Sequence, residues 1–172
     1  SLVKYGYSHK IKKITLRKKA IVNPRALTAI KEADLILVGP GSLYTSIIPN
    51  YLLSGMTEST EQTKAPIVYI SNVSTEKGET EGFSLYDHCR TLERYGIRFD
   101  LVLANKTFFP TTNKRNSVSP VRKGPKSRFD DLTIYQDLVS QENLLYHDTD
   151  KLGAAIWGII RSLKKYQRSK GF

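Results

Sequence analysis

Apolar and polar residues follow two patterns along the chain. Short apolar runs, of the length expected for buried strands, occupy 34–38, 67–70 and 100–104. Between and beyond these runs, apolar residues recur at helical spacing, which predicts helices over 24–32, 49–63, 84–94 and from 148 or 149 onwards. Strands that alternate with helices favour an α/β fold, in which a parallel sheet is covered by helices on both faces.

Residues at the element boundaries support this interpretation. Asn23 is followed by proline, a pair typical of an N-cap and the first helical position. Ser84 and Asp87 stand three residues apart and predict a capping box. Two further short strands are predicted, an edge strand over 10–16, guarded by lysines, and another within 132–139.

Length and composition indicate one globular domain spanning residues 1–172. The chain is 40% hydrophobic and 25% charged, and it has no apolar run long enough to cross a bilayer. Its one cysteine, Cys89, excludes an intrachain disulfide and a cysteine-built zinc site, and it favours a reducing, cytoplasmic setting. The sequence leaves open whether the protein is a homo-oligomer.

The net charge of +11 is concentrated in three blocks, before Glu32, from Lys106 to Arg128 and at the C-terminus. Such blocks attract phosphate or nucleic acid, but solvated surface is the reading we favour, since no aromatic stacking pattern accompanies the cations. Residues 107–128 lose all periodicity, which predicts a basic, flexible insert. Nucleic-acid binding is therefore kept as an alternative function, ranked third after the two that are given below.

Polar loops follow three of the predicted strands. They read GPGSLYTS from Gly39, SNVSTEKGETEG from Ser71 and NKT from Asn105. In a parallel sheet the carboxyl ends of the strands share one edge, so these loops are expected to converge there. This edge is the predicted site.

The GPGS turn has the chemistry of a phosphate site. Gly39 and Gly41 let a ligand approach the main chain closely, and the hydroxyls of Ser42, Thr45 and Ser46 can donate to a phosphate. The pattern is neither a P-loop nor the dinucleotide fingerprint. A tight strand-to-helix turn without a ligand is the competing interpretation.

The other loops supply weaker candidates. Asn72 lies in a loop whose carboxylates either bind a sugar hydroxyl, a magnesium ion or a nucleobase edge, or are solvated. Asn105 ends a predicted strand, and His147 precedes a helix start, where a structural role is equally open. No motif assigns a catalytic residue or a metal ligand.

Several motifs resemble one known family. These are VNPRA from Val22, EADLILVGPGSLYTSIIPNYL, KAPIVYISNVSTEKGETEGFSLYDH, DLVLANKT and HDTDKLGAAI from His147. Together they resemble the bacterial YvcK family of gluconeogenesis factors, which is related to the CofD 2-phospho-L-lactate transferases. The resemblance covers nearly the whole chain except residues 111–128.

The resemblance implies a Rossmann-like parallel α/β fold and a cytoplasmic regulatory protein without established catalysis. The implied ligand is UDP-N-acetylglucosamine, and the implied role is in carbon-source-dependent growth, cell shape and cell-wall synthesis. Contacts to the ligand or its diphosphate would come from the candidates above, Gly39, Gly41, Ser42, Thr45, Asn72, Asn105 and His147. No cofactor or metal is implied.

The CofD branch implies a different function. There the resemblance is to a transferase that moves a phospholactyl group from a guanosine diphosphate donor to a deazaflavin. GPGS stands where CofD-type sequences look more like PSNP, which favours the YvcK branch.

This chain departs from the family pattern in two ways. Family members are longer and begin with a strand and a GGGTG turn that this chain lacks, so it resembles the C-terminal half of the family fold. Tyr146 stands where many relatives carry arginine, and a tyrosine cannot pair with a diphosphate as arginine does.

Overall fold

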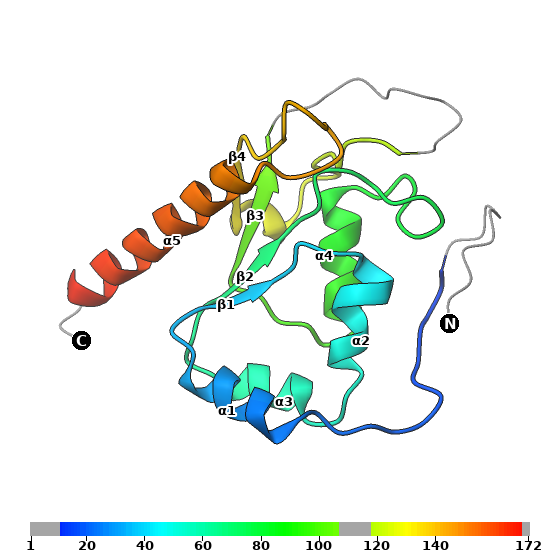
Figure 1. Cartoon of the computed structure of the whole chain (residues 1–172), viewed down its shortest axis with the longest axis vertical. Helices are drawn as coiled ribbons and strands as arrows, with labels where there is room; N and C mark the ends of the chain where they lie inside the picture. Colours follow the sequence, from blue (N-terminus) through cyan, green and yellow to red (C-terminus); the bar gives the residue numbers. More distant parts are fainter. Residues whose placement is uncertain (1–10, 107–117, 170–172) are drawn as a thin grey trace.

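The computed structural model describes residues 11–106 and 118–169 (Figure 1). Four strands form one sheet in the order β1-β2-β3-β4, namely β1 (Ile36–Val38), β2 (Ile67–Ile70), β3 (Leu101–Asn105) and β4 (Thr133–Gln136). All three strand pairs are parallel. The predicted parallel sheet is therefore confirmed, and the loops after the strands meet at the edge drawn uppermost in Figure 1.

The helical segments lie around this sheet. They are α1 (Pro24–Glu32), the π-helical turn η1 (Leu43–Ile47), α2 (Ile48–Tyr51), α3 (Met56–Gln62), α4 (Leu85–Arg94), the 3-10 turn η2 (Arg128–Asp130) and α5 (Thr149–Ser169). Figure 1 shows α1 and α3 side by side at the end of the sheet opposite the polar loops. The short η1 and α2 follow each other without a break beside α4.

Each face of the sheet has its own hydrophobic core. On one face, Tyr69 and Val102 pack in a cluster with Cys89 of α4, which is fully buried. On the other face, Val68 and Leu103 cluster with Ile159 of α5. Side chains alternate between the faces of a strand, so neighbouring residues of β2 serve different cores. The prediction of helices on both faces is confirmed.

Local sequence signals set the N-terminal ends of α1 and α4 as predicted. The Asn23 side-chain oxygen accepts a hydrogen bond from the Arg25 amide at 2.9 Å, and Pro24 is the first helical residue. In α4 the Ser84 hydroxyl accepts from the Asp87 amide, while the Asp87 carboxylate accepts from the Ser84 amide at 2.9 Å. This reciprocal capping box satisfies two amides that the helix itself leaves unpaired.

Residues 49–63 do not form the single helix that was predicted. The chain breaks between α2 and α3, where Gly55 takes the left-handed conformation with φ of 95°. There the Ser54 amide donates to the Ala20 carbonyl at 2.9 Å, and the Val22 amide donates to the Ser54 carbonyl at 3.2 Å. These two bonds to a distant segment replace the helical bonds that the break removes.

Residues 11–20 contain no strand, so the predicted edge strand over 10–16 is wrong in its described part. The Ile14 amide donates to the Tyr95 hydroxyl at 2.7 Å instead of to a neighbouring strand. Residue 10 lies outside the described residues. Ile14 and Ile11 pack on the α4-side core, which explains the apolar pattern of this segment without a sheet.

Part of the predicted flexible insert, residues 118–128, lies within the described part of the chain. Residues 107–117 lie outside the described residues, but the Ser119 carbonyl accepts from the Thr75 amide at 2.7 Å, and the Val121 amide donates to the Val73 carbonyl at 3.0 Å. Val121 is buried and anchors this stretch to the α4-side core, although its neighbours are mostly polar and basic. In the described part of the chain, no helix is both long and apolar enough to cross a membrane.

Candidate functional site

The GPGS turn runs against the carboxyl end of β2. Gly39 has φ of 91°, and a Cβ atom there would lie 2.8 Å from the Ile70 carbonyl oxygen, so only glycine fits without displacing the backbone. The Gly41 amide donates to the Asn72 side-chain oxygen at 3.2 Å. This bond joins the loops after β1 and β2, as the sequence predicted from their positions at one edge.

Two hydroxyls of this turn, those of Ser42 and Thr45, form a chain of hydrogen bonds that ends on the carboxylate of Glu79. Thr45 donates to the Ser42 hydroxyl at 2.5 Å, and Ser42 donates to Oε2 of Glu79 at 2.5 Å. The Tyr44 amide donates to the same oxygen at 3.4 Å. Glu79 therefore engages Ser42, one of the donors that the sequence assigned to a ligand phosphate.

Glu79 is unusually buried for a carboxylate, with 7% of its surface exposed. Its second oxygen, Oε1, is buried and has no hydrogen-bond partner among the described residues. The loop that carries it is tied by the Glu76 amide, which donates to the Thr80 hydroxyl at 2.8 Å. Gly78 and Gly82 flank Glu79 with φ of 77° and 73°. The sequence singled out this loop but did not distinguish Glu79 from its other carboxylates. The position of Glu79 between Gly78 and Gly82 is the feature of the sequence that could have pointed to it.

His147 reaches the same region from the segment before α5. Burial lowers the pKa of its imidazole, and a hydrogen bond with the Ser71 backbone opposes that shift. Its Nε2 is buried and has no partner within the described part of the chain. A neutral imidazole there can accept or donate one hydrogen bond to a ligand.

These loops enclose a cavity of about 440 Å³, a size that suits a small-molecule ligand. It is lined by Pro40, Gly41, Ser42, Asn72, Val73, Ser74, Thr75, Glu76, Lys77, Val118, Leu145, Tyr146 and His147. We call it the edge cavity. Among the described lining residues, the exposed Lys77 is the one lysine or arginine, and it was not among the predicted residues.

The predicted site residues therefore fall into three groups. Gly41, Ser42, Asn72 and His147 line the edge cavity. Gly39 and Thr45 adjoin it, one by supporting the turn and one by bonding Ser42. Asn105 does not line it, and its side-chain oxygen accepts from the Leu138 amide at 3.0 Å, which fixes the chain after β4.

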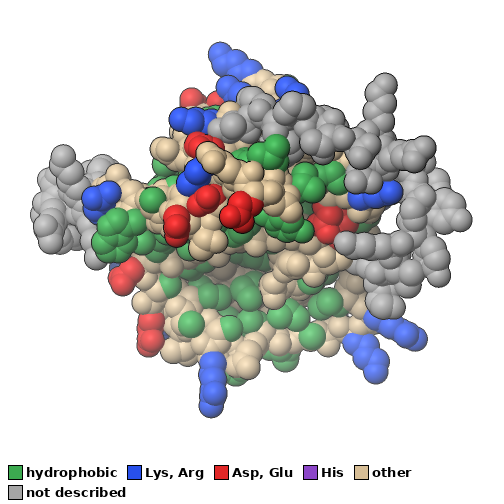
Figure 2. Space-filling view, turned by 45° about the horizontal axis from the view of Figure 1, so that its top comes forward, with side chains coloured by type: hydrophobic (Ala, Val, Ile, Leu, Met, Phe, Trp, Pro, Cys, Tyr) green, Lys and Arg blue, Asp and Glu red, His purple; other side chains and the backbone are tan. Residues whose placement is uncertain are grey.

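The surface charges around this edge are mixed. Figure 2, in which the top of Figure 1 comes forward, shows acidic and basic side chains interspersed on this face. No group of three or more histidine, cysteine or acidic side chains that could hold a metal ion occurs among residues 11–106 and 118–169. The described residues visible in Figure 2 form no continuous basic patch of the kind typical of nucleic-acid binding.

Known proteins resemble this chain in sequence and fold. Residues 1–137 match the family described as 2-phospho-L-lactate transferase CofD. The gluconeogenesis factor of Listeria monocytogenes is 41% identical over 144 residues, which are 80% of this chain and 44% of that protein. The gluconeogenesis factor of Bacillus subtilis is 33% identical over 165 residues, 90% of this chain and 52% of that protein.

A solved structure agrees with these matches. The crystal structure of a UPF0052-family protein from Bacillus halodurans has a TM-score of 0.76 at 34% identity, over 86% of this chain and 51% of that one. This chain spans about half the length of the relatives it matches. The parallel sheet, the GPGS turn and these matches lead to one conclusion: the chain belongs to the CofD family, and its relatives there are gluconeogenesis factors of the YvcK type.

Proposed function

We propose that this protein binds the nucleotide sugar UDP-N-acetylglucosamine in the edge cavity and acts as a cytoplasmic regulator rather than as a catalyst. The observation that carries the proposal is the convergence of Gly41, Asn72 and His147 on one cavity at the carboxyl edge of the sheet. Ligands of open parallel sheets bind at this edge. The hydroxyl and amide side chains in its lining, such as those of Ser74, Thr75 and Asn72, can form hydrogen bonds with a sugar diphosphate.

The hydrogen-bond donors of the edge cavity differ in whether they are available to a ligand. Lys77 is exposed and can pair with a diphosphate, and the buried Nε2 of His147 has no partner among the described residues. The Gly41 amide and the Ser42 hydroxyl are engaged by Asn72 and Glu79. A phosphate in the edge cavity would pair with Lys77 and the His147 imidazole, and it would compete with Glu79 for the Ser42 hydroxyl.

The regulatory role rests on the relatives. Proteins from Listeria monocytogenes and Bacillus subtilis that share 41% and 33% identity carry the name gluconeogenesis factor. By resemblance to the YvcK family, the role extends to cell shape and cell-wall synthesis. Since this chain spans about half of those proteins, ligand affinity is to be measured on the 172-residue chain itself.

Isothermal titration calorimetry with UDP-N-acetylglucosamine tests the proposal. Binding is expected for the unchanged chain, and Lys77→Gln is expected to weaken it about tenfold, the loss of one charge-assisted hydrogen bond. Lys31→Gln removes the same charge from α1 and serves as the matched control. No heat at millimolar ligand, or equal effects of the two variants, would refute the assignment.

The family description favours a second candidate, a transferase that uses a nucleoside diphosphate-activated donor. Fold similarity alone does not determine chemistry, so this candidate needs its own test. Incubation with lactate linked to guanosine through a diphosphate, a deazaflavin and Mg²⁺ should transfer the phospholactyl group to the deazaflavin and release guanosine monophosphate if the chain is such an enzyme. Absence of release while UDP-N-acetylglucosamine binds would leave the regulatory proposal alone.

A further inference from the structure

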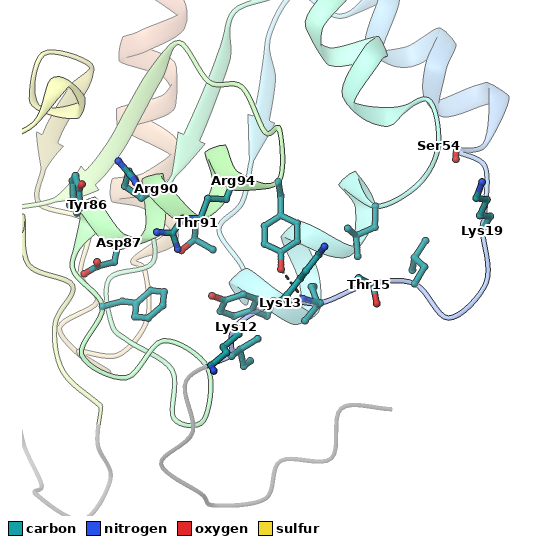
Figure 3. A pocket seen from close by; sticks show the side chains of 17 residues that line it. Lys12, Lys13, Thr15, Lys19, Ser54, Tyr86, Asp87, Arg90, Thr91 and Arg94 are labelled. Carbon is teal, nitrogen blue, oxygen red and sulfur yellow. Dashed lines mark hydrogen bonds between the residues drawn. The ribbon is translucent and has the colours of Figure 1, made fainter.

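A second and larger cavity lies away from the polar loops, under the N-terminal segment. Residues 11–19, which we call the strap, line a cavity of about 900 Å³ together with residues of α4 (Figure 3). We call it the strap cavity. It shares no lining residue with the edge cavity. Its walls come from the strap, η1, the chain after α2, and α4 with the residues that flank it.

The strap cavity is strongly cationic. Its described lining contains five basic side chains and a single carboxylate, and the basic ones are Lys12, Lys13, Lys19, Arg90 and Arg94. The carboxylate, Asp87, is committed to the capping box of α4, where it accepts from the amide and the hydroxyl of Ser84. None of the five basic residues forms an ion pair with a described carboxylate, whereas cations elsewhere, such as Arg98 and Lys151, do.

The inner wall of this cavity is aromatic. Tyr44, Phe83, Tyr86 and Tyr95 line it, and Tyr44 is 3% exposed. The Arg90 guanidinium carbon lies 5.7 Å from the centre of the Tyr86 ring, close enough for a cation–π contact. The lining of this cavity thus combines flat aromatic surface with positive charge.

One polar group points from the aromatic wall towards the strap. The Tyr95 hydroxyl accepts a hydrogen bond from the Ile14 amide, drawn as the dashed line in Figure 3. That bond uses an oxygen lone pair, so the hydroxyl proton is still available for an acceptor. The same contact holds the strap against α4 and thereby maintains the cavity.

We propose that the strap cavity binds a second ligand, a phosphorylated small molecule with a flat aromatic part. The phosphate would pair with Arg90 and Arg94, which stand four residues apart on one face of α4, together with the strap lysines. The aromatic part would pack on the tyrosine and phenylalanine wall. This site stands independently of the nucleotide-sugar proposal, because it uses other residues on another side of η1.

A nuclear magnetic resonance titration of the ¹⁵N-labelled 172-residue chain tests the proposal. The probes are adenosine monophosphate, adenosine and inorganic phosphate, each at the same concentrations and at low salt. Adenosine monophosphate is expected to shift the amides of Ile14, Thr91 and Tyr95, with an affinity at least tenfold above that of either half-probe. Shifts confined to residues of the edge cavity, or equal affinity for phosphate alone, would overturn the proposal.

Charge variants locate the phosphate. Arg90→Gln and Arg94→Gln are each expected to weaken adenosine monophosphate binding about tenfold, as loss of a charge-assisted hydrogen bond does. Arg25→Gln, which removes an exposed arginine from α1, is the matched control and should leave the affinity unchanged. An equal loss in all three variants would indicate attraction by net charge alone and would overturn the site.

A fourth variant separates binding from folding. Tyr95→Phe removes the hydroxyl that the Ile14 amide donates to, so it should release the strap and weaken binding while α4 remains folded. Thermal unfolding of each variant confirms that the fold is retained. If Tyr95→Phe loses the strap contact, seen as a shift of the Ile14 amide, yet binds unchanged, the strap is not part of the site and the proposal fails.

Discussion

Replacing Glu79 by glutamine should raise the affinity of the edge cavity for a diphosphate. The carboxylate lies 2.5 Å from the Ser42 hydroxyl and 3.4 Å from the Tyr44 amide, and it is 7% exposed. A phosphate oxygen bonded to Ser42 would therefore sit roughly 5 Å from the carboxylate, two hydrogen-bond lengths away. Glu79→Gln keeps the size of the side chain and removes this repulsion.

The size of the effect follows from Coulomb's law. Two unit charges about 5 Å apart repel by about 2 kcal/mol at an effective dielectric constant of about 40, intermediate between the protein surface and water. Each 1.4 kcal/mol is about tenfold in affinity. We therefore expect UDP-N-acetylglucosamine to bind Glu79→Gln at least about tenfold more tightly than the unchanged chain, with a smaller gain at high salt.

The assay is calorimetry of both chains with the same ligand, with Glu81→Gln as the control that removes one charge from the same loop. Urea unfolding should show Glu79→Gln to be less stable by about 1–2 kcal/mol, since a charge-assisted hydrogen bond is lost. Weaker or unchanged binding by Glu79→Gln would refute the reasoning, because the phosphate would then lie away from Ser42. A gain of equal size in Glu81→Gln would assign the effect to net charge instead.

Three further changes test the fold and its pH dependence. Gly39→Ala should destabilise the protein by about 2 kcal/mol or more in urea unfolding, because its Cβ would lie 2.8 Å from a carbonyl oxygen at positive φ. Gly78→Ala, which has open space around it, should cost about 1 kcal/mol. Equal costs of the two substitutions would contradict this reasoning. Ser84→Ala removes the cap of α4 and should cost about 1 kcal/mol, and an unchanged urea midpoint would speak against the capping box. Burial lowers the pKa of His88 from 6.5, so the unfolded chain takes up the proton first. The free energy of unfolding should then be fully retained above about pH 6.5 and fall as the pH drops towards the lowered pKa. His88→Gln should flatten this dependence on pH. An unaltered pH dependence in that variant would contradict the role assigned to His88.

Elements with local signals could be predicted from the sequence. Asn23 and the Ser84–Asp87 pair act within three residues of themselves, so the starts of α1 and α4 were predicted correctly. The break after α2 could not be predicted, because the Ser54 amide is bonded to Ala20, far away along the chain. The strap was assigned a strand for the same reason: the Tyr95 hydroxyl that takes the Ile14 amide is 81 residues away.

For the candidate site, the sequence could predict only those features that follow from the topology of a parallel sheet. Parallel strands bring their following loops to one edge, which placed Gly41 and Asn72 together. The sequence cannot tell which polar group serves the protein and which remains for a ligand. Asn105 bonds the Leu138 amide, and Glu79 rather than a ligand engages Ser42; both outcomes depend on distances that only the folded chain sets.

The burial of Cys89 makes the protein its own reporter of unfolding. This thiol is the one cysteine of the chain, it is fully buried on α4, and burial raises its pKa to about 12. Since thiolates are the reactive species, a thiol-specific reagent can label the folded protein only when α4 leaves the sheet. The labelling rate at neutral pH, compared with that of the unfolded chain, therefore measures the free energy of this opening without any denaturant.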